Sequence, residues 1–491
     1  MCHRQICQRA QPQNETQSRI LGRRTEHLPP PPNRFSTFVS RHRGKLKRHR
    51  QQASKRLSAE LSKRLYYVAG TMPNPTLKLN DGATQFRLRL TLSLLTNTPL
   101  LIRNIRSSSL DAPGLTPYEI SYLRLIDGLT NGTQIEINAT GTQLKFKPGI
   151  LVGGEVRHDC PVGRPTATST ADAAVVDDHN TGITNPRSIG FYLEYILPLA
   201  PFCKSPISLT VTGITDGLTT LDPSPDYLAA SHLHLLQSQF GLGREADEDY
   251  PPSITVIKRG AAPLGGGVVK FYSPIVKRSG VGSGELLPID CCGLGKIKRV
   301  RGKVVCCKIP PSSAARAAHS AKGVMHRLLP DVWVHTDSYS SKAKAAVAGS
   351  ATKRGKDGCG PSPGMTIHLI AQSTEGHVLA AETSLDPTSS RGRVLPEDLG
   401  QKAAALLLEE IRRGGCIDTG AQSLAFILMS LGPEDVARIR VGTLSKYSVE
   451  TLRLIKKMVG VEFKVTGDEE SKTVILSCLG SGYRNYSKAS T

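Results

Sequence analysis

Three cation-bearing segments of this sequence have the composition of anion-binding sites. The run KRGAAPLGGG sets Lys258 and Arg259 beside glycines whose backbone N–H groups can approach an anion closely. The run PRSIG places Arg187 at the start of an expected helix, where unpaired N–H groups and the helix dipole favour a phosphate. A third segment, Lys296–Lys303, alternates cations along an expected strand. A solvated turn or a charged edge strand would explain each segment alone, but together they favour binding to a phosphate backbone.

The cysteines and histidines predict no metal site and no cofactor. The 11 cysteines include two adjacent pairs but no C-x-x-C spacing, and the histidines form no metal-binding constellation, so neither a zinc site nor a disulfide scaffold is expected. Cys306 and Cys307 lie in an apolar, strand-like run, where buried thiols act as small apolar side chains. Trp333 is expected in the core, and His158 is expected to be structural. This pattern favours a reduced, intracellular protein.

Net charge divides the chain into a strongly basic start and a mildly basic remainder. The chain carries 63 Lys or Arg against 41 Asp or Glu, a net charge of +22. Residues 1–65 hold 16 of the basic and 3 of the acidic residues, and they are too polar to bury a core of their own. Such a charge favours polyanionic partners, nucleic acid among them. No run approaches the roughly 20 apolar residues of a membrane helix, so a membrane protein is excluded.

The leader, residues 1–71, is expected to be basic and disordered. It has the composition of a nuclear-targeting or RNA-binding arm, and also that of a transit-like peptide, because it is rich in Arg and poor in acids. A third interpretation is an over-extended gene model that is absent from the mature protein, because Met72 directly precedes the first well-patterned segment. No functional prediction therefore depends on this leader.

From about residue 77, helices followed by a pair of strands recur three times, which predicts an α/β protein built from three repeated sheet-plus-two-helix modules. Hydrophobic periodicity sets the type of each element. The expected helices are 118–129, 188–199, 227–240, 397–413, 422–431 and 448–459. The expected strands are 100–105, 134–137, 143–146, 207–211, 253–258, 268–272, 438–441, 461–465 and 473–478.

Residues 285–385 have a different rhythm, which predicts a smaller inserted α/β domain. Its expected elements are strands at 304–309, 332–335, 366–371 and 377–382 and a helix at 312–329. We therefore expect a large domain in two parts, 72–284 and 386–491, of which the second is the third module. Loop insertions rich in small and polar residues are expected at 163–185 and 338–364.

The order of about a dozen short motifs carries a resemblance to a known family. Among them are DGATQFRLRLTLSLLTNTPL, KPGILVGGEVRHDCP, PRSIGFYLEYILPLAPF, KRGAAPLGGGVV and LLLEEIRRGGCIDTGAQSLAFILMSL. Over roughly residues 77–488 the chain resembles the RNA 3′-terminal phosphate cyclase superfamily, and within it the eukaryotic cyclase-like branch that lacks cyclase activity. The resemblance implies a large domain of three repeated modules with a smaller inserted domain, in agreement with the periodicity.

The resemblance also implies that the cyclase chemistry is lost. True cyclases adenylylate a histidine, and Tyr447 stands at the position expected for it. The pKa of a phenol is about 10, and a phenol lacks the imidazole nitrogen needed for a phosphoramidate. Ser423 stands where the cyclases have an acidic nucleotide contact, and the glycine-rich phosphate segment is degraded to DGATQFR at 81–87. Adenylylation and cyclisation are therefore not expected.

The resemblance implies a cleft in which the cyclases carry out their chemistry. In this chain the residues expected at that cleft are basic, and we predict that the cleft binds RNA or another anion. Arg87 and Arg89 are two residues apart in a segment interpreted as a strand, so their side chains would share a face. Further cations expected near them are Arg103, Arg106, Arg187, Lys258 and Arg259. Arg453 and Lys456 are spaced i, i+3 on a helix, and they either contact RNA or form an ordinary solvated helix face.

The resemblance implies a ribosome-biogenesis factor located in the nucleus, and there in the nucleolus. Its implied partners are pre-rRNA within the small-subunit processome and a ribosome-assembly GTPase, and it would be needed when the precursor of the small-subunit rRNA is cleaved. An alternative is an endonuclease that cuts this precursor, for which Glu397, Asp398 and Asp418 would have to converge. A third hypothesis, retained RNA 3′-terminal phosphate cyclase activity, is opposed by Tyr447.

Overall fold

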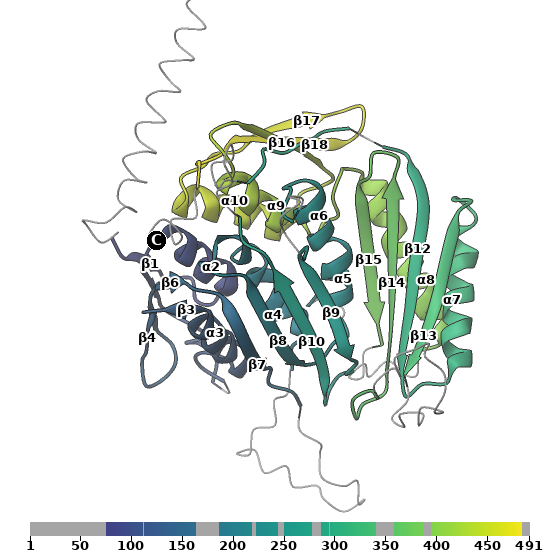
Figure 1. The fold of residues 1–491 in the computed structure, drawn as a ribbon, viewed down its shortest axis with the longest axis horizontal. Helices are drawn as coiled ribbons and strands as arrows, with labels where there is room; N and C mark the ends of the chain where they lie inside the picture. Colours follow the sequence, from purple (N-terminus) through teal and green to yellow (C-terminus); the bar gives the residue numbers. More distant parts are fainter. Residues whose placement is uncertain are drawn as a thin grey trace, which may run out of the picture. The chain divides into compact units, whose positions relative to one another are not determined.

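The computed structural model describes residues 75–110, 112–163, 186–218, 222–243, 250–276, 286–293, 295–339, 358–385 and 394–483. The expected leader, and most of the two expected loop insertions, lie outside these residues. Helices and mixed sheets together form an α/β fold, as predicted (Figure 1). Within this part of the chain, no helix combines the length and the apolar character needed to cross a membrane.

Three four-stranded sheets share one connectivity, which confirms the predicted repeat. In each sheet the first two strands are parallel, the fourth strand in sequence pairs antiparallel with the second, and the third strand lies at the far edge. The first module consists of β1 (Leu77–Leu79), α2 (Phe86–Thr96), β2 (Leu100–Ile102), α3 (Pro117–Leu129), β4 (Gln134–Ile137) and β5 (Leu144–Lys147). A small two-stranded sheet of β3 (Thr130–Asn131) and β6 (Ile150–Leu151) follows α3 and β5.

The second and third modules repeat this order of elements. The second consists of β7 (Gly154–Asp159), α4 (Ile189–Ile196), β8 (Ile207–Gly213), α5 (Pro225–Ala230), α6 (His232–Ser238), β9 (Ser253–Lys258) and β10 (Gly267–Ser273). The third consists of β11 (Asp290–Cys291), α9 (Gln422–Leu431), β16 (Val436–Val441), α10 (Lys446–Met458), β17 (Lys464–Asp468) and β18 (Thr473–Leu479). The segment 227–240, expected as one helix, forms two helices that are separated at Ser231. The Ser231 hydroxyl donates a hydrogen bond to the Asp418 carboxylate.

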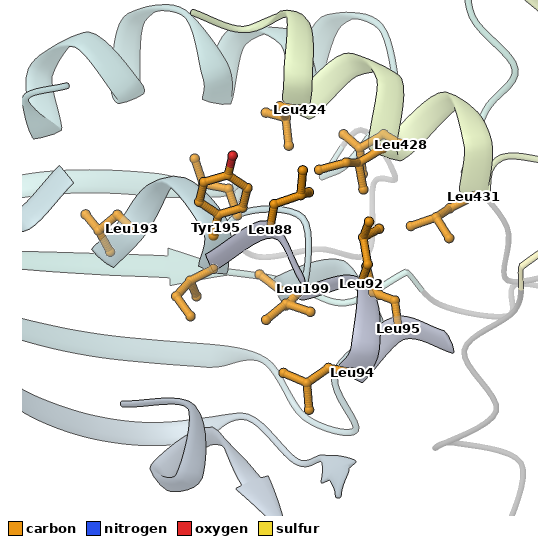
Figure 2. Packing of buried hydrophobic residues seen from close by; sticks show 14 of the residues in the cluster. Leu88, Leu92, Leu94, Leu95, Leu193, Tyr195, Leu199, Leu424, Leu428 and Leu431 are labelled. Carbon is orange, nitrogen blue, oxygen red and sulfur yellow. The ribbon is translucent and has the colours of Figure 1, made fainter. Parts of the chain in front are cut away.

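The first helix of each module packs into one shared apolar core. Leu88 and Leu92 of α2, Leu193 of α4, and Leu424 and Leu428 of α9 meet there (Figure 2). All ten residues of α9 are buried, and so are seven of the eight residues of α4. A helix that is buried on every side needs no polar stripe, which is why these two segments are apolar almost throughout.

Helix α2 corrects the prediction that Arg87 and Arg89 lie on a strand. In FRLRLTLSLL every second residue is leucine, and this period of two is typical of a half-buried strand. The segment is instead a helix in which every residue from Leu88 to Leu95 is buried. Residues two apart on a helix are separated by roughly 200° around its axis, so the two arginine side chains leave α2 in different directions.

The insert has a sheet of its own, in the order β13-β12-β14-β15. Its strands are β12 (Ile297–Cys307), β13 (Val332–Tyr339), β14 (Gly364–Ser373) and β15 (Val378–Ser384). Helices α7 (Pro311–Met325) and α8 (Pro396–Arg413) cover one face of this sheet and share its apolar core (Figure 1). Cys306 and Cys307 are buried in β12, as expected for apolar thiols.

Two predictions about the insert are wrong. The segment 397–413 was grouped with the third module, but the buried face of α8, with Leu399, Ala403 and Leu407, belongs to the core of the insert. An amphipathic pattern shows that a face is buried, but not what covers it. Trp333 was expected in the core, yet 60% of it is exposed, because β13 is an edge strand that turns Val332 and Val334 inward and the residue between them outward.

Candidate functional site

A cavity of about 310 Å³ lies where the first turns of four helices meet. These are α2 and α3 of the first module, α4 of the second and α10 of the third. A helix N-terminus carries a partial positive charge from N–H groups that have no partner within the helix. The side chains that line the cavity include Arg87, Arg187, Tyr118, Phe191, Tyr195 and Tyr447. The structure thus brings together three of the residues predicted from sequence: Arg87, Arg187 and Tyr447.

Arg87, in the first turn of α2, contacts one acid and two aromatic rings. Its Nη1 donates to the Glu194 carboxylate at 2.8 Å and to the Phe191 carbonyl. Its guanidinium carbon lies 4.0 Å from the ring centre of Phe191 and 4.7 Å from that of Tyr195. Among the described residues, Nε and Nη2 of Arg87 have no hydrogen-bond partner. The cation is therefore held in place while part of its donor capacity stays unused.

Arg187 reaches the same Phe191 ring from the segment that precedes α4. Its guanidinium carbon lies 4.6 Å from the centre of that ring and 5.1 Å from the ring centre of Tyr118. Its Nη2 lies 2.6 Å from Asp222 Oδ1, and in the part of the chain that is described its buried Nε has no partner. Burial raises the pKa of the Asp222 carboxyl, although Arg187 and Arg87 act in the opposite direction. Two like charges on one ring repel each other, and the acids beside them offset that repulsion.

Tyr447, the second residue of α10, closes the cavity beside the arginines. Burial raises the pKa of its phenol well above the ordinary value, and nearby Glu194 adds to the rise while Arg87 opposes it. The phenol therefore keeps its proton at neutral pH, which makes it a poor nucleophile. Ser423 does not line this cavity: it is buried in α9, and its hydroxyl lies 3.0 Å from Thr451 Oγ1 in α10.

Sequence reasoning missed the aromatic rings and acids that hold the two arginines. Phe191 and Tyr195 are spaced i, i+4 on α4, so an aromatic stripe was foreseeable from sequence. Nothing in that spacing pointed to Arg87, which lies 104 residues away from Phe191 in the chain. Asp222 begins the motif DPSPDYL, in which nothing indicated a contact with Arg187, and it also accepts a hydrogen bond at 3.1 Å from the backbone N–H of Ser188 at the start of α4.

Three other predicted cations of the first module lie outside the cavity lining. Arg89 is buried, donates to the Gly82 carbonyl at 2.9 Å and pairs with Asp81, so it fastens the turn that precedes α2. Arg103 is exposed just after β2. Arg106 pairs with Glu119, a residue that does line the cavity, and also donates to the Gly114 carbonyl at 2.8 Å.

Arg259 belongs to a second group of charges, which we call the Arg259 cluster: Asp226, Arg259, Lys303, His368 and Glu382. Arg259 forms a bidentate pair with Asp226, and Nζ of Lys303 lies 3.7 Å from the same carboxylate. Nδ1 of His368 lies 3.0 Å from Glu382. Burial would raise the pKa of Asp226, but Arg259, His368 and Lys303 hold it well below its ordinary value. These contacts join the second module to the insert, and they occupy Arg259.

The glycine run after Lys258 packs closely against other backbone segments, and its expected role as an anion cradle stays a prediction. The Gly260 N–H already donates to Thr215 Oγ1 at 3.0 Å. A Cβ added at Gly360 of the insert would lie 1.9 Å from the Gly265 carbonyl oxygen, so only glycine fits there. Lys258 itself is half-buried at the end of β9 and does not line the cavity.

Arg453 and Lys456 lie on the exposed side of α10, outside the cavity lining. The ammonium of Lys456 lies 3.0 Å from a carboxylate oxygen of Glu462. This placement fits the interpretation of an ordinary solvated helix face, and a contact with RNA remains a prediction. An exposed pair of this kind contributes little to stability.

Two of the three acids expected to converge in a nuclease, Asp418 and Glu397, have separate structural partners. Asp418 is fully buried and accepts hydrogen bonds from the hydroxyls of Tyr227 and Ser231 and from the backbone N–H groups of Ala421 and Ala380. Glu397 forms a bidentate pair with Arg316, which links α8 to α7 on the exposed side of the insert. The oxygens of Asp418 are thus committed to the fold, which leaves them unsuited to holding a metal for hydrolysis.

A third group of side chains, which the sequence did not predict, could hold a metal ion. Ligand atoms of Cys291, His377 and Cys416 all lie within 4.8 Å of one another. Spacing rules did not find this group, because 86 residues separate Cys291 from His377 in the chain. Such rules detect ligands that one short loop or one helix presents together.

Comparison with known proteins places these observations in a family. The family model for RNA 3′-terminal phosphate cyclase matches residues 78–465. The chain is 39% identical over 413 residues to the RNA 3′-terminal phosphate cyclase-like protein of Homo sapiens, covering 83% of this chain and 96% of the human protein. It is 36% identical over 419 residues to an rRNA processing protein of Schizosaccharomyces pombe, covering 85% of this chain and 99% of that protein.

Proposed function

Because this chain belongs to the RNA 3′-terminal phosphate cyclase family, we propose that it is an rRNA-processing factor that holds an RNA phosphate between Arg87 and Arg187 without cyclising it. More narrowly, it acts as a nucleolar factor when the precursor of the small-subunit rRNA is cleaved. Its similarity to a Schizosaccharomyces pombe protein that is named for rRNA processing supports this proposal.

The two guanidinium groups on the Phe191 ring carry the phosphate part of the proposal. Guanidinium donors match the geometry of phosphate oxygens and bind them through strong, charge-assisted hydrogen bonds. Unused donors of Arg87 and the four helix N-termini add to the positive potential inside the cavity. A volume of about 310 Å³ lies within the usual range for small-ligand pockets.

The same cavity lacks the nucleophile that cyclisation requires. Tyr447 presents a phenol whose pKa is raised well above the ordinary value, so its oxygen stays protonated near neutral pH. We expect that the protein incubated with labelled ATP and magnesium forms no acid-labile histidine adduct. Detection of such an adduct would restore the cyclase hypothesis.

Pre-rRNA within the small-subunit processome and a ribosome-assembly GTPase are the partners that we propose. The family resemblance of the sequence supports both of them. The phosphate site can be tested without either, because it needs only the protein and a short RNA.

The binding test compares two double variants by fluorescence anisotropy with a short RNA that ends in a 3′-phosphate. We expect Arg87→Gln with Arg187→Gln to weaken binding at least tenfold, since a hydrogen bond to a charged group contributes about 1.5–3 kcal/mol. Arg157→Gln with Arg327→Gln is the matched control, because both side chains are exposed and lie outside the cavity lining. Equal loss in the two double variants would mean that net charge alone attracts RNA.

The cellular test asks whether the cavity is needed for rRNA processing. Cells that depend on the Arg87→Gln, Arg187→Gln protein should accumulate the uncleaved precursor of small-subunit rRNA, whereas cells with the control protein should not. Northern blotting of the precursors measures this difference. Normal processing with a cavity variant that no longer binds RNA would contradict the proposed function.

A further inference from the structure

We propose that Cys291, His377 and Cys416 bind a zinc ion that fastens the insert to the third module. Cys291 lies in β11, immediately before the chain enters the insert, and Cys416 lies just after α8, where the chain leaves it. His377 lies in the turn between β14 and β15, inside the insert. One ion bound to all three would therefore join both crossing points of the chain to the insert itself.

The spacing of the three ligand atoms fits a tetrahedral ion. Zinc bonds of about 2.3 Å to sulfur and about 2.0–2.1 Å to nitrogen place a thiolate and an imidazole nitrogen about 3.6 Å apart, and two thiolates about 3.8 Å apart. Sγ of Cys291 lies 3.5 Å from Nδ1 of His377. All three ligand atoms are within 4.8 Å of one another, and both cysteines are free. Small side-chain adjustments would bring them around one ion.

The imidazole of His377 already has the outer contact that a metal-binding histidine needs. Its Nε2 lies 3.2 Å from the Gly293 carbonyl, while Nδ1 is the nitrogen nearer to Cys291. Histidine ligands commonly donate one ring N–H to a backbone carbonyl, which fixes the tautomer and turns the other nitrogen toward the metal. The backbone of His377 is fixed as well, because its N–H donates to Ser373 Oγ at 2.9 Å.

Burial and charge favour a divalent ion with two thiolates. Cys291 and Cys416 are only 3% and 1% exposed. Two thiolates, a neutral imidazole and Zn²⁺ have no net charge, so the complex avoids the cost of a buried uncompensated ion. This mixed sulfur and nitrogen donor set suits zinc. A cavity of about 10 Å³ adjoins His377 and Cys416, which is about the space for one water as the fourth ligand.

A bound zinc would make the root of the insert more stable. The ligands are far apart in the chain, so an ion that joins them reduces the entropy of the unfolded chain, and its binding free energy adds to folding. This inference is independent of the proposed RNA site, because none of the three ligands lines the cavity of Arg87 and Arg187.

The experiment measures zinc in the full-length protein after reconstitution with zinc alone and removal of the excess by gel filtration. Elemental analysis should find about one ion per chain in the wild type, and Cys291→Ser, Cys416→Ser and His377→Ala should each lose most of it. Cobalt in place of zinc should give the absorption of a tetrahedral thiolate complex, and the same three variants should lose it. Removing the zinc with a chelator should lower the melting temperature of the wild type, but not that of Cys416→Ser.

Two further variants keep the test decisive if a substitution impairs folding. Cys292→Ser changes the neighbouring, half-exposed thiol and should retain the zinc. His377→Cys replaces one zinc ligand by another and should also retain the zinc. Loss of zinc from His377→Ala but not from His377→Cys would exclude a general folding defect. Zinc retained by Cys416→Ser, zinc lost from Cys292→Ser, or a Cys291–Cys416 disulfide in place of bound zinc would overturn the proposal.

Discussion

The cavity of Arg87 and Arg187 and the Arg259 cluster contain the same kinds of charge, yet their cations differ in what they can still bind. Arg87 pairs with one carboxylate, lies on an aromatic ring, and keeps two nitrogens without a partner among the described residues. Arg259 places both terminal nitrogens on Asp226 and is 4% exposed. The comparison teaches that an arginine can serve as a ligand site only where the fold leaves its donors unused.

The two regions also differ in what they connect. The cavity joins helix N-termini of the three repeated modules, so its positive potential belongs to the large domain. The Arg259 cluster joins α5 and the end of β9 to the insert strands β12, β14 and β15. Charges in the first region are therefore expected to affect mainly binding, and charges in the second mainly stability.

The largest effect is expected from Arg259→Ala. Arg259→Ala removes both hydrogen bonds to the Asp226 carboxylate, whose side chain is 18% exposed, and breaking such a largely buried pair costs about 3–5 kcal/mol of unfolding free energy. Urea unfolding at neutral pH measures this loss. Arg87→Ala is the comparison variant, because Arg87 donates one hydrogen bond to Glu194 whereas Arg259 donates two to Asp226, and the two carboxylates are similarly exposed, at 16% and 18%. Similar losses in the two variants would remove the distinction between the regions.

Replacing Asp216 is expected to increase the free energy of unfolding, whereas replacing Arg259 decreases it. Asp216 lies beside the Arg259 cluster and is 7% exposed. Burial raises the pKa of this carboxyl from 3.8 to about 6, although Arg259 and His368 act against the rise. Between these two pKa values the native state binds more protons than the unfolded chain, so the free energy of unfolding falls as pH rises from about 4 to about 6.

Asp216→Asn removes this ionisation and tests that sign. The variant should be more stable than the wild type at pH 7, by about 3 kcal/mol, and less dependent on pH between 4 and 6. Urea unfolding at several pH values measures both differences. A variant less stable than the wild type at pH 7 would show that the ionised carboxylate contributes favourable contacts with Arg259.

Salt dependence of RNA binding should sharpen the description of the cavity. For single-stranded RNA, each neutralised phosphate contributes about 0.7 to the slope of log affinity against log salt. Because Arg87 and Arg187 share one phosphate in the proposed site, the Arg87→Gln, Arg187→Gln protein should show a slope reduced by about 0.7, whereas Arg259→Gln should leave the slope unchanged. The protein must begin near Met72, so that the basic leader does not contribute. An unchanged slope in the cavity variant would place the phosphate contacts elsewhere.

Glu194→Gln is expected to tighten binding to the same RNA. Glu194 accepts a hydrogen bond from Arg87 at 2.8 Å and competes with a phosphate for that cation. Removing its charge should increase affinity several-fold, on the order of 1 kcal/mol, while Arg87 stays anchored to the Phe191 carbonyl. Anisotropy titration at one salt concentration measures the change. Weaker binding would mean that Glu194 positions Arg87 rather than competing for it.

The smallest effect is expected from Arg453→Gln. This side chain is exposed on α10, so its replacement should change the free energy of unfolding by less than about 0.5 kcal/mol. RNA affinity should change less than twofold if the solvated-face interpretation is right. A clear loss of affinity in the titration would instead support RNA contact by this helix face.

The sequence by itself determined the three modules and the insert, and it places a phenol at residue 447. Local periodicity and turn residues define helices and strands, and their repeated order predicts a repeated sheet because each module must cover its own apolar face. The predicted helix 422–431 coincides with α9, and the predicted strand 134–137 coincides with β4. Tyr447 offers a phenol and no imidazole nitrogen wherever the fold places it.

Only the tertiary structure decided which partners each charged or thiol side chain meets. Arg87 and Arg259 carry the same guanidinium, but Glu194 lies 107 residues from the first and Asp226 lies 33 residues from the second. Cys291 and His377 likewise meet across 86 residues. The helical state of α2 could not be predicted from local sequence either. An amphipathic helix is recognised by a polar stripe beside an apolar one, and α2 lacks such a stripe because it is buried on all sides. A local pattern records the hydrophobicity of a face, whereas pKa, ion pairing and metal binding depend on atoms that only folding brings together.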